Sequence, residues 1–223
     1  MLIFENARPV PLPNQAPMAE LTFRLQPGEL LLVRLESGNE QLPLADAAAG
    51  LLPIDTGRVL FQGQDWSRID QDQALRLRAQ IGRVFDWHGW VSNLDVIENI
   101  TLAQRHHTRR SLREITEEAQ ALASAFNLPE VPRGRPAAVP HRDLRRAEWV
   151  RAFMGRPALV CLERPGMGVA GEHLASLARA VNELCARGGA ALWLAADDRE
   201  CRAAAADRLR RCAMQGEVLK ELD

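Results

Sequence analysis

Apolar and polar positions alternate along the chain with two periods, one of two residues and one close to 3.6. In the first third, strand patterns are followed by short helical ones, and Pro27-Gly28 predicts a turn between two strands. Strands are expected over residues 2–7, 20–35 (interrupted by that turn) and 57–66. Helices are expected over 42–52 and 72–85, the latter running into another strand.

The second half of the chain continues the alternation with longer helical stretches. Residues 93–128 are mainly helical by spacing, and a further helix is expected from about Leu144 to Met154. Residues 158–163 form an uninterrupted apolar run typical of a buried parallel strand, and residues 172–198 predict a helix, a Gly-Gly turn and a second such strand. The pattern predicts an α/β fold with a largely parallel sheet flanked by helices. We expect one domain over residues 1–223, with a helical insert over about 93–155.

Composition excludes several classes of function. The formal net charge of −1 over 223 residues offers no basic field for nucleic acid. The four cysteines lie far apart with no paired or metal-ligand spacing, which favours a reducing cytosolic compartment and no metal site. We expect no signal peptide and no membrane span, so that any membrane association comes through a partner.

Four segments in one order resemble the ATP-binding subunit of an ABC transporter. They are LQPGELLLV, AGLLPIDTGRVLFQGQDW, IGRVFDWHGWVSNLDVIENITL and RRAEWVRAFMGRPALVCLERP. In that family they are the strand before the phosphate loop, the helix end with the next strand, the glutamine-loop region, and the signature helix leading to the acidic strand. The resemblance covers residues 1 to about 220. It implies a P-loop NTPase-like core with a mainly parallel sheet, an N-terminal antiparallel β-subdomain and a helical subdomain.

The phosphate loop departs from the family pattern G-x-x-x-x-G-K-[S/T], whose backbone N–H groups, lysine and hydroxyl hold phosphate and Mg²⁺. The matching stretch is LESGNEQLP, which ends at Pro43. Gly38 is kept, whereas other residues stand at the glycine, lysine and hydroxyl positions: Leu35, Glu40, Gln41 and Leu42. Loss of the lysine removes a charge-assisted hydrogen bond of about 1.5–3 kcal/mol, and a carboxylate there repels a polyanion. We expect ATP and Mg²⁺ binding to be weak or absent.

The other catalytic positions of the resemblance have changed as well. Asp86 stands for the glutamine, Arg164 for the catalytic glutamate and Ala196 for the switch histidine. Glu163 keeps the carboxylate of the magnesium-side aspartate, while Arg164 cannot act as a general base near neutral pH. The signature motif matches five residues that retain neither glycine: Val139, Pro140, His141, Arg142 and Asp143. We therefore expect no catalytic residue.

The segment that resembles the permease-docking groove keeps its apolar character. The candidate docking residues are Trp87, Trp90, Leu94 and Val96. Helical spacing equally fits Val96 and Ile100 as core residues, and for these two we favour the core. Trp87 and Trp90 lie in a polar turn that contains glycine, where exposed aromatic side chains commonly mark contact surfaces.

Two groups of basic residues have open alternatives. His106 and His107 cannot share one helix face, so a solvated helix end is expected rather than a metal site. The arginines of the signature helix either face ATP bound to a partner or form a solvated face: Arg142, Arg145, Arg146 and Arg151.

The residues and the resemblance together predict a degenerate ABC-type subunit, a pseudo-ATPase peripheral to the inner face of a membrane. Its expected partners are a membrane permease and a second ABC ATPase subunit. One alternative is an active ATPase with atypical motifs that uses Glu163, Arg164 and Arg142; another is a free-standing regulatory module. The segment SNLDVIENITL is similar to subunits of bacterial lipid-trafficking transporters of the MCE type.

Overall fold

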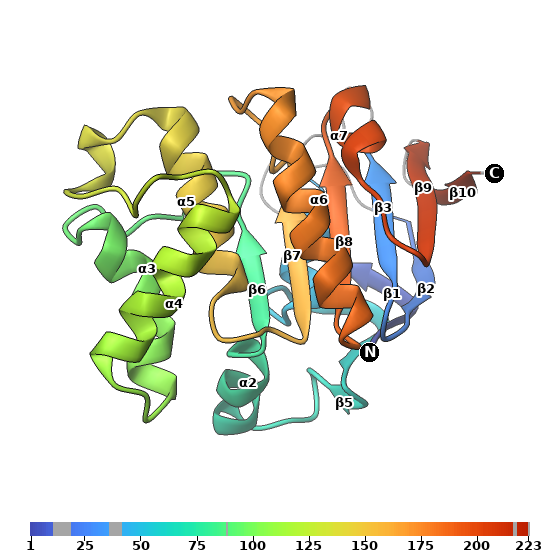
Figure 1. Cartoon of the computed structure of the whole chain (residues 1–223). Helices are drawn as coiled ribbons and strands as arrows, with labels where there is room; N and C mark the ends of the chain where they lie inside the picture. Colours follow the sequence, from blue (N-terminus) through green and yellow to red (C-terminus); the bar gives the residue numbers. More distant parts are fainter. Residues whose placement is uncertain (11–18, 36–41, 88, 216–217, 223) are drawn as a thin grey trace.

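The computed structural model describes residues 1–10, 19–35, 42–87, 89–215 and 218–222. These residues form two sheets with helices on one side and at one end (Figure 1). The predicted α/β architecture is confirmed.

The larger sheet has six strands in the order β10-β9-β3-β8-β7-β6. Their bounds are β3 Leu30–Arg34, β6 Ile81–Val84, β7 Leu159–Glu163, β8 Ala190–Ala195, β9 Leu209–Gln215 and β10 Val218–Leu222. All neighbours pair in parallel except β9 and β10, which are antiparallel. The buried runs of β7 and β8 lie at the centre, as expected for strands that are covered on both faces.

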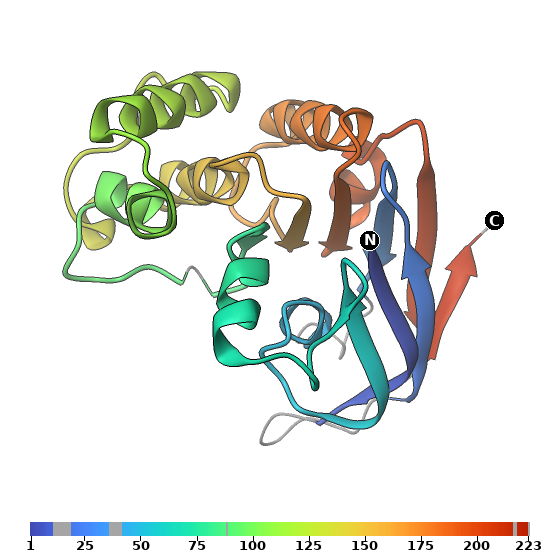
Figure 2. The same ribbon diagram turned by 90° about the horizontal axis from the view of Figure 1, so that it is seen from below.

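The smaller sheet is antiparallel, with the order β2-β1-β4-β5. Its strands are β1 Leu2–Pro9, β2 Leu21–Leu25, β4 Ile54–Phe61 and β5 Gln64–Asp65. Figure 2 shows the two sheets facing each other, with the short helix α1 (Leu44–Ala48) between them. Apolar side chains from both sheets and α1 form one of the two hydrophobic cores.

The second core lies on the other face of the large sheet, beneath the longer helices. The remaining helices are α2 Gln71–Arg78, α3 Val96–His107, α4 Leu112–Ala125, a 3-10 turn Pro136–Ala138, α5 His141–Phe153, α6 Gly171–Ala186 and α7 Asp198–Ala203. Helices α3, α4 and α5 pack on one another beside β6, within the range expected for the helical insert (Figure 1). Among the described residues, no helix is long and apolar enough to cross a membrane.

Local sequence explains where several helices begin. Ser111 caps α4 by accepting from the backbone of Glu114, whose carboxylate accepts from the Ser111 backbone in return. Helix α5 begins at His141, three residues before the expected Leu144, because Pro140 has a φ of −55° and places the chain for the first helical turn.

Candidate functional site

The carboxyl ends of β3, β6, β7 and β8 meet at one edge of the large sheet, the upper edge in Figure 1. Ligands of open α/β sheets bind at this edge. The predicted site residues lie at or just after the ends of these strands: Leu35 follows β3, Asp86 follows β6, Glu163 ends β7 with Arg164 directly after it, and Ala196 follows β8. The fold therefore brings together positions that are far apart in sequence.

The phosphate-loop positions are described in part. Gly38, Glu40 and Gln41 lie outside the described residues. Leu35 and Leu42 are buried, with 7% and 8% of their surface exposed, and both pack into the core between the sheets. Pro43 lies directly before α1. The magnesium-ligand position of the resemblance is thus an apolar side chain turned into the core, which offers no oxygen to a cation.

Glu163 is paired with an arginine that the motif comparison did not single out. Arg83 of β6 donates from Nη2 to the Glu163 carboxylate and from Nη1 to Asp46 Oδ1 at 2.6 Å. Burial raises the pKa of Glu163, and Arg83 opposes that rise. Burial by itself lowers the pKa of Arg83, but its two carboxylate neighbours outweigh this and raise it. The carboxylate that the resemblance assigns to the magnesium side is therefore already paired with a cation of the protein.

Arg164 is paired in the same way with Asp86. Its Nε and Nη2 donate to the two oxygens of the Asp86 carboxylate, with 2.5 Å between Nη2 and Oδ2. Such a fork is the strongest geometry for an arginine and a carboxylate. Arg164 has a φ of +43°, an unusual conformation for a residue other than glycine, and its backbone N–H donates to Leu194 O. The residues at the catalytic-glutamate and glutamine positions thus bind each other.

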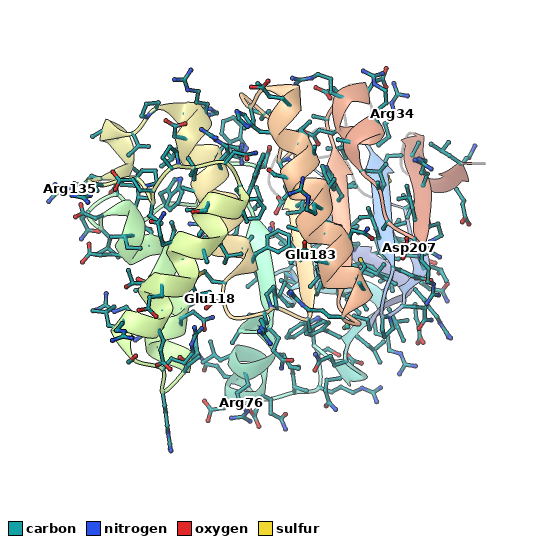
Figure 3. All side chains as sticks on the ribbon, in the orientation of Figure 1. Arg34, Arg76, Glu118, Arg135, Glu183 and Asp207 are labelled. Carbon is teal, nitrogen blue, oxygen red and sulfur yellow. The ribbon has the colours of Figure 1, made fainter. Side chains whose placement is uncertain are left out.

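Among the described residues, the arginines at this edge of the sheet are each paired with a carboxylate. Arg83 and Arg164 face the three carboxylates of Asp46, Glu163 and Asp86. Arg34, at the end of β3, is labelled in Figure 3 and contacts Asp198 at 3.0 Å. A polyanion entering here would meet carboxylates before it found an available guanidinium group.

Glu200 is a site residue that the sequence analysis missed. It is fully buried and accepts from Trp193 Nε1 at 3.1 Å and from the backbone of Gly166 and Ala196 at 2.8 and 3.3 Å. Burial raises the pKa of Glu200, and these hydrogen bonds only partly oppose that rise. Glu200 therefore joins the turn after β7 to the turn after β8, at the Ala196 position. Its sequence context, DDRE, gives no signal because it looks like an exposed charged turn.

The signature-motif positions lie at the start of α5. Four of them, Val139, Pro140, Arg142 and Asp143, line a groove of about 750 Å³. Ala170 and His173, at the start of α6, line the same groove. A β-carbon on Gly168 would lie 2.6 Å from His141 Nδ1, so the turn after β7 packs tightly against the start of this helix. Where the resemblance predicts signature glycines, this segment has a proline and charged side chains.

Three of the four arginines of α5 contradict the solvated face considered from the sequence. Arg145 is fully buried and donates to Glu148 Oε2 at 2.6 Å, and Arg146 donates to Asp143 and to Asn127 O at the same distance. Arg151 donates to Gly89 O at 2.7 Å. These three do not form a solvated face, because they bind carboxylates and carbonyls of their own chain. Arg142 alone among the four has a largely exposed side chain.

The candidate docking residues divide into exposed and buried ones. Trp87 is 72% exposed, whereas Val96 is fully buried and Leu94 is half-buried. Trp90 is also half-buried, with Arg151 stacked 4.5 Å from its ring centroid. The expectation of an exposed turn is thus correct for Trp87 and wrong for Trp90, which packs on the helical core. Val96 points inward from the first turn of α3, which confirms the core position favoured from the sequence and removes Val96 from the candidate docking residues.

The remaining candidate chemistry is limited. No group of three or more histidine, cysteine or acidic residues in the described ranges has the arrangement of a metal site. All four cysteines are free, as expected. His106 and His107 are exposed at the end of α3, which confirms the solvated helix end.

Comparisons with known proteins agree with this architecture. No protein-family profile matches the chain. The chain is 26% identical to the lipoprotein-releasing system ATP-binding protein LolD of Idiomarina loihiensis, over 81% of this chain and 79% of that protein. It is 25% identical to the cell division ATP-binding protein FtsE of Escherichia coli, over 74% of each chain.

Solved structures show the same fold. The dimeric ATP-binding cassette MJ0796 in a post-hydrolysis state bound to ADP and Pi superposes with a TM-score of 0.87, covering 100% of this chain and 98% of that chain at 16% identity. A second dimeric structure of MJ0796, described as a bacterial ABC transporter cassette, gives a TM-score of 0.83, with coverage of 96% and 94% at 16% identity. The chain therefore has the fold of an ABC ATPase cassette.

Proposed function

We propose that this chain, whose fold and relatives support an ABC transporter ATP-binding domain, is a pseudo-ATPase of a transport complex. It docks on a membrane permease, contributes shape rather than hydrolysis, and lies at the cytoplasmic face of the membrane through that contact. A second ABC ATPase subunit supplies the energy, in a dimer like the one described for MJ0796.

The observation that carries the proposal is the pair of ion-pair groups at the carboxyl edge of the sheet. Arg164 binds Asp86, and Arg83 binds Glu163 and Asp46. A catalytic carboxylate has to be free to accept a proton from water, and a magnesium-side carboxylate has to be free to bind the metal shell. In this chain the first has been replaced by a cation and the second holds a guanidinium group.

The experiment that tests the proposal is purification of the tagged chain from membranes of its native host, with identification of the proteins that accompany it. A permease together with a second cassette that retains its phosphate loop would support the proposal. Recovery of the chain alone, or with partners that are not membrane proteins, would instead favour the free-standing module.

The active-ATPase alternative needs Glu163, Arg164 and Arg142 to act on nucleotide. The ion pairs count against this alternative, because Glu163 would first have to release Arg83 and Arg164 would have to release Asp86. Arg142 is exposed but lies at the start of α5, on the groove beside α6 rather than at the ends of β3 and β7.

We expect Arg164→Glu not to restore ATP hydrolysis in the purified chain. The substitution restores the family's carboxylate but leaves Gln41 and Ala196 in place, and catalytic groups that act as a unit do not return activity one at a time. The new carboxylate would also face Asp86. Phosphate release is measured against the wild-type chain; clear turnover by this single variant would contradict the proposal.

We expect Trp87→Ala to weaken co-purification with the permease and leave the thermal midpoint nearly unchanged. The side chain is 72% exposed, so its loss removes little packing, whereas an aromatic anchor in an interface contributes about 2 kcal/mol, or thirtyfold in affinity. Leu112→Ala is the matched control, since Leu112 is 60% exposed on α4. Equal yields from both variants would remove Trp87 from the interface.

The transported substrate is proposed from one segment of the chain and from one relative. The segment SNLDVIENITL is similar to lipid-trafficking transporters, and one relative is named for lipoprotein release. We propose a lipid or lipid-modified substrate, to be identified from the permease that co-purifies.

A further inference from the structure

Four arginines from three separate elements converge on the chain that follows β6. They are Arg83 of β6, Arg145 and Arg151 of α5, and Arg164 after β7. Their common target is the segment Phe85–Trp87 with Gly89–Val91, called here the arginine-held segment. It connects the edge of the sheet to α3 and carries Trp87.

The backbone of the arginine-held segment is fixed by α5. Arg145 donates to Phe85 O at 2.7 Å and to Asp86 O at 3.3 Å, and Arg151 donates to Gly89 O at 2.7 Å. These carbonyls lie in irregular chain, where no strand or helix partner satisfies them, and charge-assisted hydrogen bonds are the strongest available substitutes.

The side chains of the segment are held by the same arginines. The guanidinium carbons of Arg83 and Arg151 lie 4.5 and 5.3 Å from the centroid of the Phe85 ring. Arg151 also lies 4.5 Å from the centroid of the Trp90 ring. Contacts of this kind between a cation and an aromatic face gain strength when they are shielded from water. The two rings and the arginines form one continuous stack between the edge of the sheet and α5.

Both ends of the segment are tied down as well. Asp86 is held by the two-pronged contact with Arg164. At the other end, the buried Asn99 of α3 accepts from Val91 N at 2.8 Å and donates to Val91 O at 3.1 Å. All these anchors are groups of the protein itself, and none needs a bound ligand.

We propose that the arginine-held segment is locked in one conformation by the chain's own arginines, so that its shape, and with it the position of the exposed Trp87 at the docking contact proposed above, does not respond to nucleotide. The inference rests on the proposed docking function and deepens it. Trp87 and Val91 are 72% and 42% exposed, while the residues behind them are bound from three sides. A segment ordered in advance loses less conformational entropy on binding, so docking stays constant through every state of the partner ATPase.

Hydrogen exchange of the isolated full chain, followed by mass spectrometry, tests the preformed shape. We expect wild-type protection over residues 84–95 that Mg-ATP leaves unchanged. Arg164→Gln removes one anchor and should raise exchange across that stretch about tenfold, with little change in β8 or α6. The control, Arg113→Gln, removes the ion pair of Arg113 and Glu117 on the exposed face of α4 and should leave the stretch unchanged.

A charge exchange completes the test. The double variant Asp86→Arg with Arg164→Asp restores an ion pair, and aspartate tolerates the positive φ at position 164, so protection should return. Unchanged exchange in Arg164→Gln would overturn the inference. So would a uniform loss of protection through β7 and β8, since the pair would then stabilise the whole core. Neither result depends on the permease, so failure here is distinguishable from failure of docking itself.

Discussion

Calorimetric titration of the full chain with ATP and Mg²⁺ is expected to show no binding tighter than about 10 µM, or roughly −7 kcal/mol. In the sequence, Gln41 and Leu42 remove the lysine and the hydroxyl that hold phosphate and metal. In the structure, Leu42 is packed into the core, and Arg83 and Arg164 are bound to carboxylates. A triphosphate would have to compete with three carboxylates for two cations, without gaining the loop that normally surrounds it.

The same titration with inorganic tripolyphosphate serves as a control for the phosphate contacts alone. It should give equally little heat, because the missing interactions are those of the phosphates rather than of the base. A dissociation constant below about 10 µM for Mg-ATP would contradict a silent site. It would show that residues outside the ion-pair groups hold the nucleotide.

Replacing Arg145 by alanine is expected to lower the free energy of unfolding by about 3–5 kcal/mol. Arg145 and Glu148 are both fully buried, and their side chains are 2.6 Å apart. Removing the arginine leaves the Glu148 carboxylate without its closest cation and the Phe85 carbonyl without its donor. Urea unfolding gives the measurement. Arg113→Ala is the matched control, since its pair with Glu117 is largely exposed and should cost at most about 1 kcal/mol.

The loss of unfolding free energy in Arg145→Ala should depend on pH. Burial raises the pKa of Glu148 to about 7 from its ordinary value of 4.5, although Arg145 acts to lower it. Without Arg145 the pKa rises further, so the folded variant holds a proton that the unfolded chain releases above 4.5. Stability of the variant relative to wild type should therefore be highest near pH 5 and fall as the pH rises through 7. A pH-independent difference would show that the protonation of Glu148 does not govern the loss of stability.

The spacing of hydrophobic residues along the chain predicted most of the fold, because most helices and strands bury one continuous face. The runs that became β7 and β8 are apolar at nearly every position, and α4 has a capping box directly before its apolar stripe. The last part of the chain gave no such signal. Strand β9 contains Arg210 and Arg211 and buries small or flexible residues, so its place beside β3 follows from the sheet rather than from its own pattern.

The motif positions of the site were assigned from the resemblance to the ABC family, which gave no indication of their partners. Arg83 and Glu163 are 80 residues apart, and Arg164 and Asp86 are 78 apart. Which charges meet is decided by the parallel order of β6 and β7, whereas sequence shows only that charges are present. The arginines of α5 were misjudged for the same reason: a charged helix is normally solvated, and nothing local indicates that carbonyls of another segment will receive its side chains.

Gly82 of β6 lies against α5 so closely that a β-carbon would come within 1.8 Å of Ala152 O. Any side chain there would force the helix away from the strand, and with it Arg145 and Arg151. A substitution at Gly82 would therefore act at a distance from its own position. It would displace the helix that carries Arg145 and Arg151, and through them the backbone of Phe85 and Gly89 that these arginines hold.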